Sequence, residues 1–150
     1  MRSTLGQTAS MGDTELVYSV WVTAKPAADL PGKWVVHCLD FDVVSQGDSL
    51  EHAMMMIAEA ASIVLVEDLK SHRDPLARRA PESEFEEMWE MVRSGDRVTH
   101  DVAFADLTGT YVYAFPAELR VPRASVSGTK PSIASTRRVP VVAFAKKRTA

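Results

Sequence analysis

Cysteine is almost absent from this sequence. Cys38 is the only one in 150 residues, so no disulfide can form within the chain, and a lone cysteine is typical of reducing compartments. No apolar run reaches the ~20 residues that a helix needs to cross a bilayer, and residues 1–12 lack the apolar segment of a signal peptide. With 7 Gly and 8 Pro, the chain is also not collagen-like or of low complexity. These absences predict a soluble cytoplasmic protein with no membrane partner.

Acidic residues are missing from residues 119–150, which hold 8 Lys and Arg. Residues 1–118 hold 9 Lys and Arg against 20 Asp and Glu, a net charge of −11. An acidic body attracts basic partners and repels nucleic acid, whereas a basic segment does the reverse. We therefore expect a flexible N-terminus over 1–13, a folded domain over 14–118 and a basic, flexible C-terminal arm over 119–150.

Alternating apolar residues predict an antiparallel sheet. Residues 16–23 are rich in β-branched and aromatic side chains and form a first strand, and residues 34–39 and 41–46 follow as a second and a third. The short connections between them favour a three-strand meander. Residues 110–115, which end at Pro116, form a later strand.

Helical spacing of apolar residues predicts a long helix from Leu50 to about Lys70, with its apolar side on the sheet. A second helix begins at Pro81, carries glutamates in its first turns and ends at Gly95. The predicted fold class is therefore α+β. It consists of a small antiparallel sheet (a three-strand meander plus a later strand) packed by one long helix, with a second helix appended and a basic irregular C-terminal arm.

The connection between the third strand and the long helix has the residues of a turn and a helix cap. Gly47 provides backbone freedom for the reversal, and Asp48 or Ser49 can accept a hydrogen bond from the first free amides of the helix. If Asp48 is the cap, Glu51 stands three residues on and completes a capping box. We expect Gly47, Asp48, Ser49 and Glu51 to have this structural role.

Three segments, YSVWV at 18–22, WVVHCLD at 34–40 and VVSQGDSLEHA at 43–53, resemble the HicB antitoxin family. The resemblance covers about residues 16–70, and its most specific part is the Ser45-Gln46-Gly47-Asp48-Ser49 turn between a strand and a helix. Ser49 stands where the family usually has Thr, another hydroxyl that can cap the helix. His52 is a departure, because the family commonly has Glu there.

The resemblance implies an incomplete ribonuclease-H-like fold and a role that is not catalytic. HicB proteins bind and neutralise HicA toxins, which are small basic mRNA-cleaving proteins. Many members also carry a C-terminal ribbon-helix-helix or helix-turn-helix module that represses their own operon. After Arg120 this chain matches neither module, and prolines at 122, 131 and 140 interrupt it. The protein expected from the resemblance is not an enzyme and needs no cofactor or metal.

Five residues are candidates for partner binding: Trp21, Trp34, Asp40, Asp42 and Met55. Met55 points away from the expected buried side of the long helix, whereas Met54 and Met56 can join the core, and methionine suits an adaptable interface. A large apolar residue exposed on a helix is also common without any function, so both interpretations stay open. Edge strands in so small a sheet favour a homodimer.

Asp40 and Asp42, close to His37 and Cys38, also fit a metal-dependent nuclease, because paired carboxylates can hold Mg²⁺. Such a site needs further carboxylates from other elements, and the sequence indicates none. We therefore expect the two aspartates to form a turn. Cys38 has no partner motif for zinc or nucleophilic chemistry and is expected in the core.

The basic arm offers an alternative function, a stand-alone HicB-like protein that binds nucleic acid, such as its own operator DNA, through phosphate contacts. The candidate phosphate-binding residues are Arg120, Arg123, Lys130, Arg137, Arg138, Lys146, Lys147 and Arg148. The arm can equally fold against its own acidic body or serve as a soluble tail.

Overall fold

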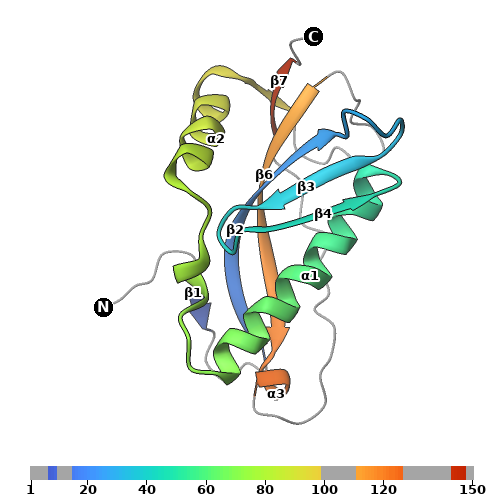
Figure 1. Cartoon of the computed structure of the whole chain (residues 1–150). Helices are drawn as coiled ribbons and strands as arrows, with labels where there is room; N and C mark the ends of the chain where they lie inside the picture. The colour runs from blue at the N-terminus through green and yellow to red at the C-terminus, as the bar shows by residue number, and fades with distance from the viewer. Residues whose placement is uncertain (1–6, 10–14, 99–110, 127–142, 148–150) are drawn as a thin grey trace.

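The computed structural model describes residues 7–9, 15–98, 111–126 and 143–147 (Figure 1). Most of the predicted flexible N-terminus lies outside these ranges. So do four of the predicted phosphate-binding residues, Lys130, Arg137, Arg138 and Arg148. The α+β fold class is confirmed, since an antiparallel sheet packs against one long helix and a second helix is added to it.

The described residues contain one antiparallel sheet of seven strands. The strands are β1 (Gln7–Ala9), β2 (Glu15–Pro26), β3 (Trp34–Cys38), β4 (Val43–Gly47), β5 (Asp96–Val98), β6 (Tyr111–Pro122) and β7 (Ala143–Lys147). Their order across the sheet is β4-β3-β2-β6-β7-β5, and β1 pairs with β2. The predicted meander is confirmed as β2-β3-β4, with Val22 opposite Cys38 and Cys38 opposite Val43.

The later strand is longer than predicted and lies in the middle of the sheet. β6 does not end at Pro116 but continues to Pro122, and it pairs with β2 from Glu15 opposite Pro122 to Ala24 opposite Tyr113. The predicted domain boundary after residue 118 therefore falls inside a strand. Proline is tolerated at position 116 because β7 pairs only with residues 111–114, so among the described strands β6 has one open edge there.

The two main helices cover opposite faces of the sheet. α1 (Leu50–Lys70) confirms the predicted long helix, and α2 (Glu82–Ser94) begins one residue after Pro81, which is its N-cap. Alternate residues of β2 show the two faces, because Val20 and Val22 pack in the core under α1 while Trp21 packs with α2. Two short helices, the 3-10 helix η1 (Pro75–Arg78) and α3 (Arg123–Val126), complete the described elements.

The turn from β4 into α1 depends on the small size of Gly47. A Cβ atom at this position would overlap the backbone nitrogen of Ala53 and lie 2.7 Å from its Cα atom. The prediction that Gly47 is needed for backbone freedom is wrong, because its φ is not positive. Glycine is required here for space, since the end of β4 lies directly against the first turn of the helix.

Ser49, not Asp48, caps α1. The Oγ of Ser49 accepts a hydrogen bond from the amide of His52 at 3.0 Å. The ring Nδ1 of His52 in turn accepts the amide of Asp48 at 3.0 Å. The predicted Asp48–Glu51 capping box is therefore wrong, and His52 takes the part expected of Glu51. The side chain of Asp48 is instead engaged by Lys33, which lowers the pKa of this carboxyl.

We predict that Gly47→Ala lowers the free energy of unfolding by about 1–3 kcal/mol, because the added methyl group has to push α1 away from β4. Urea unfolding followed by circular dichroism measures the loss. The neighbouring Gln46→Ala, at an exposed position, is the control and should change stability by less than about 0.5 kcal/mol. An unchanged stability of Gly47→Ala would contradict the close contact.

Candidate partner-binding surface

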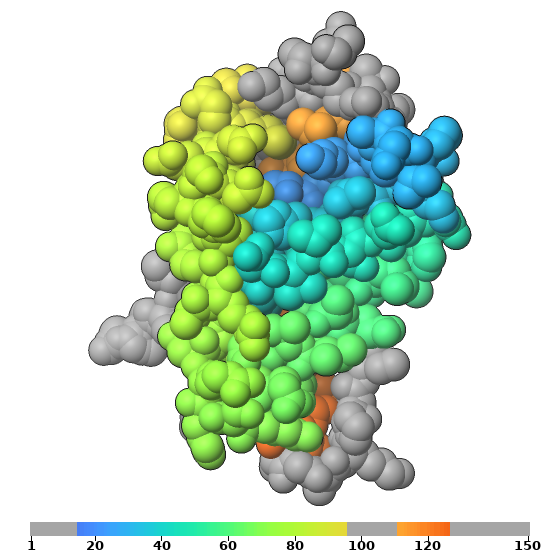
Figure 2. All heavy atoms as spheres, viewed as in Figure 1, coloured from blue at the N-terminus to red at the C-terminus, as the bar shows by residue number. Residues whose placement is uncertain are grey.

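The solvent side of α1 alternates acidic and apolar residues. Side chains four apart are neighbours on the surface of an α-helix. Five exposed residues at this spacing define what we call the outer face of α1: Glu51, Met55, Glu59, Ile63 and Glu67. Met55 and Ile63 are each 62% exposed, and Met56 beside them is 38% exposed. Figure 2 shows α1 (green) at the surface, beside the β3–β4 hairpin (cyan). Met55 is thus exposed as predicted, whereas the prediction that Met56 joins the core is wrong.

The opposite side of α1 fixes the helix on the sheet. Its buried residues are Leu50, Ala53, Ile57, Ala58, Ala61, Ser62, Leu65 and Asp68. The large apolar members each contribute about 1.5–3 kcal/mol through burial, and the alanines let the helix lie close to β3 and β4. Because this side supplies the packing, the exposed Met55 and Ile63 add little to the stability of the fold.

A buried carboxylate anchors the C-terminal end of α1. Asp68 is 1% exposed, and its Oδ1 accepts hydrogen bonds from Arg73 Nε at 3.0 Å and from Arg78 Nη2 at 2.8 Å. Both arginines belong to the segment that follows the helix, which is thereby tied to it. The hydrogen bonds, led by those of Arg78, outweigh desolvation and lower the pKa of Asp68 to about 2.

We predict that Asp68→Asn lowers the free energy of unfolding at pH 7 by about 2 kcal/mol, because charge-assisted hydrogen bonds become neutral ones. The pKa of Asp68 is lower in the folded chain than its ordinary value of 3.8. Its charge therefore stabilises the fold above about pH 4, and this contribution is lost as the pH falls toward about 2.

Urea unfolding of both proteins between about pH 2 and pH 7 measures this difference. The Asp68→Asn variant should lose that part of the acid dependence, whereas Glu86→Gln at an exposed position of α2 should keep it. Equal stabilities of wild type and Asp68→Asn at neutral pH would show that the two arginines do not depend on this carboxylate.

The structure places the two predicted tryptophans differently. Trp34 is 9% exposed and lies in the main core, with its ring centroid 6.1 Å from that of Tyr113. Its prediction as a partner-binding residue is wrong, because β6 and α1 enclose it. Trp21 is half-buried on the other face of the sheet and packs edge-to-face on Trp89 of α2, with the ring centroids 5.3 Å apart.

The two predicted aspartates bond to different groups. Asp40 Oδ1 accepts the backbone amide of Trp21 at 2.6 Å, and burial raises the pKa of this carboxyl. Asp42 is exposed, adopts a left-handed φ of 51° and bonds His37 Nε2 at 2.8 Å. The other ring nitrogen of His37 lies 3.5 Å from Glu84 of α2. The carboxylates of Asp42 and Glu84 therefore approach different nitrogens of the His37 ring. Within the described ranges, no group of three or more His, Cys, Asp or Glu could hold a metal ion.

The beginning of the predicted basic arm belongs to the sheet. Arg120 lies within β6, where its guanidinium bonds Glu118 at 2.8 Å and Glu15 at 3.4 Å. Phosphate binding by Arg120 stays a prediction, and in the structure its guanidinium is paired with one carboxylate from β2 and one from β6. Arg123 lies in α3, and Lys146 and Lys147 lie in β7, opposite Val112 and Tyr111.

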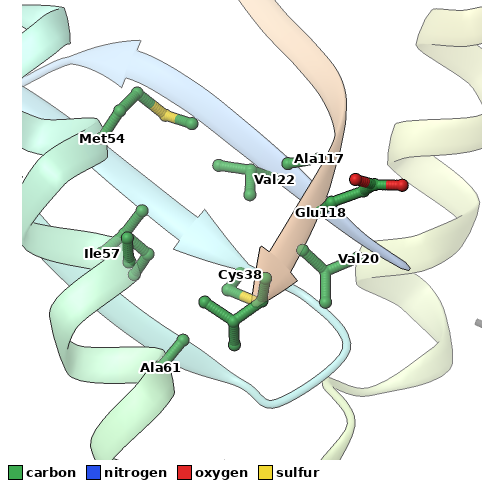
Figure 3. A pocket seen from close by; sticks show the side chains of 10 residues that line it. Val20, Val22, Cys38, Met54, Ile57, Ala61, Ala117 and Glu118 are labelled. Atoms are coloured by element: carbon green, nitrogen blue, oxygen red, sulfur yellow. The ribbon is translucent and has the colours of Figure 1, made fainter. Parts of the chain in front are cut away.

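A small apolar cavity of about 30 Å³ lies between α1 and the sheet (Figure 3). Its lining includes Val20, Val22, Cys38, Met54, Ile57, Ala61 and Ala117. The prediction that Cys38 belongs to the core is confirmed. Burial is the main cause that raises the pKa of its thiol to about 12, so the thiol stays protonated at neutral pH and is a poor nucleophile.

Two features of α1 escaped the sequence prediction. Asp68 follows the apolar stripe at helical spacing, three residues after Leu65, and arginines come soon after it. A charged residue on a buried stripe is the signal that could have identified this ion pair. Glu51, Glu59, Ile63 and Glu67 were missed as companions of Met55, although their four-residue spacing is visible in the sequence.

In the part of the chain that the structure describes, none of the helices has the length and apolar character needed to cross a membrane. No protein-family model matches the chain, and searches of curated proteins and of solved structures give no match.

Proposed function

We propose that the chain is a HicB-like antitoxin, a non-catalytic protein that binds and neutralises a small basic mRNA-cleaving toxin of the HicA type. The observation that carries the proposal is the path of residues 45–53, which leave β4, turn at Gly47 and enter α1 at the Ser49 cap. This segment is the most specific part of the resemblance to HicB. The contact between Gly47 and Ala53 gives a physical reason for the glycine within it.

The charge of the exposed helices supports a basic partner. The outer face of α1 carries three glutamates, and α2 exposes Glu82, Glu86, Glu87 and Glu90. Negative charge concentrated in this way speeds the approach of a basic protein and repels nucleic acid. The surface therefore favours a small basic protein as the partner class.

The aspartates that suggest a nuclease are used within the fold. Asp40 is bonded to the backbone of β2, and Asp42 is bonded to His37, which also approaches α2. These contacts hold the β3–β4 turn and α2 against the sheet. Their structural use supports a protein that acts by binding and not by chemistry.

The position of Arg120 favours this proposal over the nucleic-acid-binding alternative. Phosphate binding needs cations that are free to replace counterions. Arg120, the first cation of the predicted arm, is instead paired with Glu118 and Glu15.

We predict that a small basic HicA-type protein is encoded beside the gene of this chain, and that co-expression of this chain restores the growth of cells producing it. The two proteins should also co-purify, with an association rate that falls at least tenfold between 50 mM and 500 mM salt, since ions screen the attraction. Growth assays and stopped-flow fluorescence measure these effects.

The charge-neutral variant Gln46→Ala is the control and should protect as the wild type does. Continued toxicity together with the absence of any complex would contradict the proposed function.

A further inference from the structure

We infer that the outer face of α1 is the surface on which the basic toxin docks. This inference rests on the proposed function and adds the location of the contact and the chemistry of the matching surface. The partner would present apolar side chains spaced to match two helical turns, with Lys or Arg between them. Met55 and Ile63 would form the apolar centre, and the glutamates would form the charged contacts around it.

The apolar residues exposed on this face have no part in the packing of α1 on the sheet. Ala53, Ile57 and Leu65 on the inner side of α1 are at most 3% exposed, whereas Met55 and Ile63 are 62% exposed on the opposite side. The packing of α1 on the sheet therefore does not need Met55 or Ile63. Met55 and Ile63 lie two turns apart on either side of Glu59, and Met56 lies next to Met55. Large apolar side chains exposed among charged residues are typical of a protein interface.

The carboxylates of this face are available to a partner. Several acidic side chains elsewhere in the described residues are engaged by cations, namely Asp48 by Lys33, Asp68 by Arg73 and Arg78, and Glu118 by Arg120. Within the same described ranges, no ion pair reaches the side chains of Glu51, Glu59 or Glu67. Their negative charge can therefore pair with Lys or Arg of a partner.

The charge pattern selects among possible occupants. If two copies packed α1 against α1 in an antiparallel pair centred on Glu59, Glu59 would face its own copy and Glu51 would face Glu67. Like charges placed in this way oppose a symmetric dimer through this face. Nucleic acid and anionic membranes are repelled for the same reason. A basic protein is the occupant that satisfies both the apolar patch and the glutamates.

Labelling at single cysteines tests the location. Because Cys38 is buried, a cysteine introduced at an exposed site can be modified selectively. We predict that the HicA-type toxin slows modification of Met55→Cys at least tenfold. Val44→Cys is the matched control, since Val44 is 59% exposed and lies on the sheet face opposite α1. Its modification should change by less than twofold.

Binding measurements on charged variants complete the test. The double variant Met55→Asp with Ile63→Asp should weaken toxin binding at least 30-fold. Glu59→Lys should weaken toxin binding about tenfold, and its binding should depend less on salt than that of wild type. Asp29→Lys in the β2–β3 loop makes the same change of charge at an exposed position elsewhere and should bind within twofold of wild type. Urea unfolding verifies that the variants fold, as expected for positions that are already exposed.

The outcomes separate the two proposals. If wild type binds the toxin while the α1 variants bind equally well, or if Val44→Cys is protected and Met55→Cys is not, the docking surface is wrong and the antitoxin function stands. If wild type forms no complex, both are wrong.

Discussion

The close contact between the end of β4 and the first turn of α1 is the constraint on which the rest of the molecule depends. No side chain fits between Gly47 and the backbone of Ala53, so the helix begins directly against the strand. The Ser49 cap and the ion pair between Lys33 and Asp48 hold the same turn. Once the direction of α1 is fixed here, its apolar stripe lies over β3 and β4 and its outer face points into solvent.

The other end of α1 is fixed by charge. Asp68 ties the helix to the segment that leads toward α2, through Arg73 and Arg78. A helix held at both ends and along one side presents its free side as a rigid surface, so little conformational entropy is lost when a partner binds. The packing of α1 therefore does not use the residues of its outer face, which leaves that face free for the proposed recognition.

Local patterns predicted those parts of the fold that depend on neighbours in the sequence. The alternation in β2 and the helical spacing in α1 each arise within one element, and both elements lie where they were expected. Pairing between distant segments could not be predicted in this way. Pro116 and Arg120 suggested a strand end and a free arm, yet β6 pairs with β2 across this stretch.

The candidate site was predicted only in part, because some of its features depend on local spacing and others on contacts between distant segments. Met55 is exposed because its position on α1 follows from helical spacing alone. Trp34 is buried because Tyr113, which is distant in sequence, packs beside it. The position of Asp68 on the buried stripe indicates that it is paired, but the identity of its partners, Arg73 and Arg78, depends on where the chain turns after α1. The outer face of α1 itself could have been found by extending the four-residue spacing from Met55 in both directions.

Methyl NMR of the chain labelled at its 7 methionines is the most direct test of the claim that α1 binds a basic toxin through its outer face. On addition of the HicA-type protein, we predict that the methyl signals of Met55 and Met56 shift or broaden. The signal of Met88, which lies on the buried side of α2, should stay unchanged. Unchanged signals of Met55 and Met56 in a complex that does form would show that the toxin does not dock on the outer face of α1.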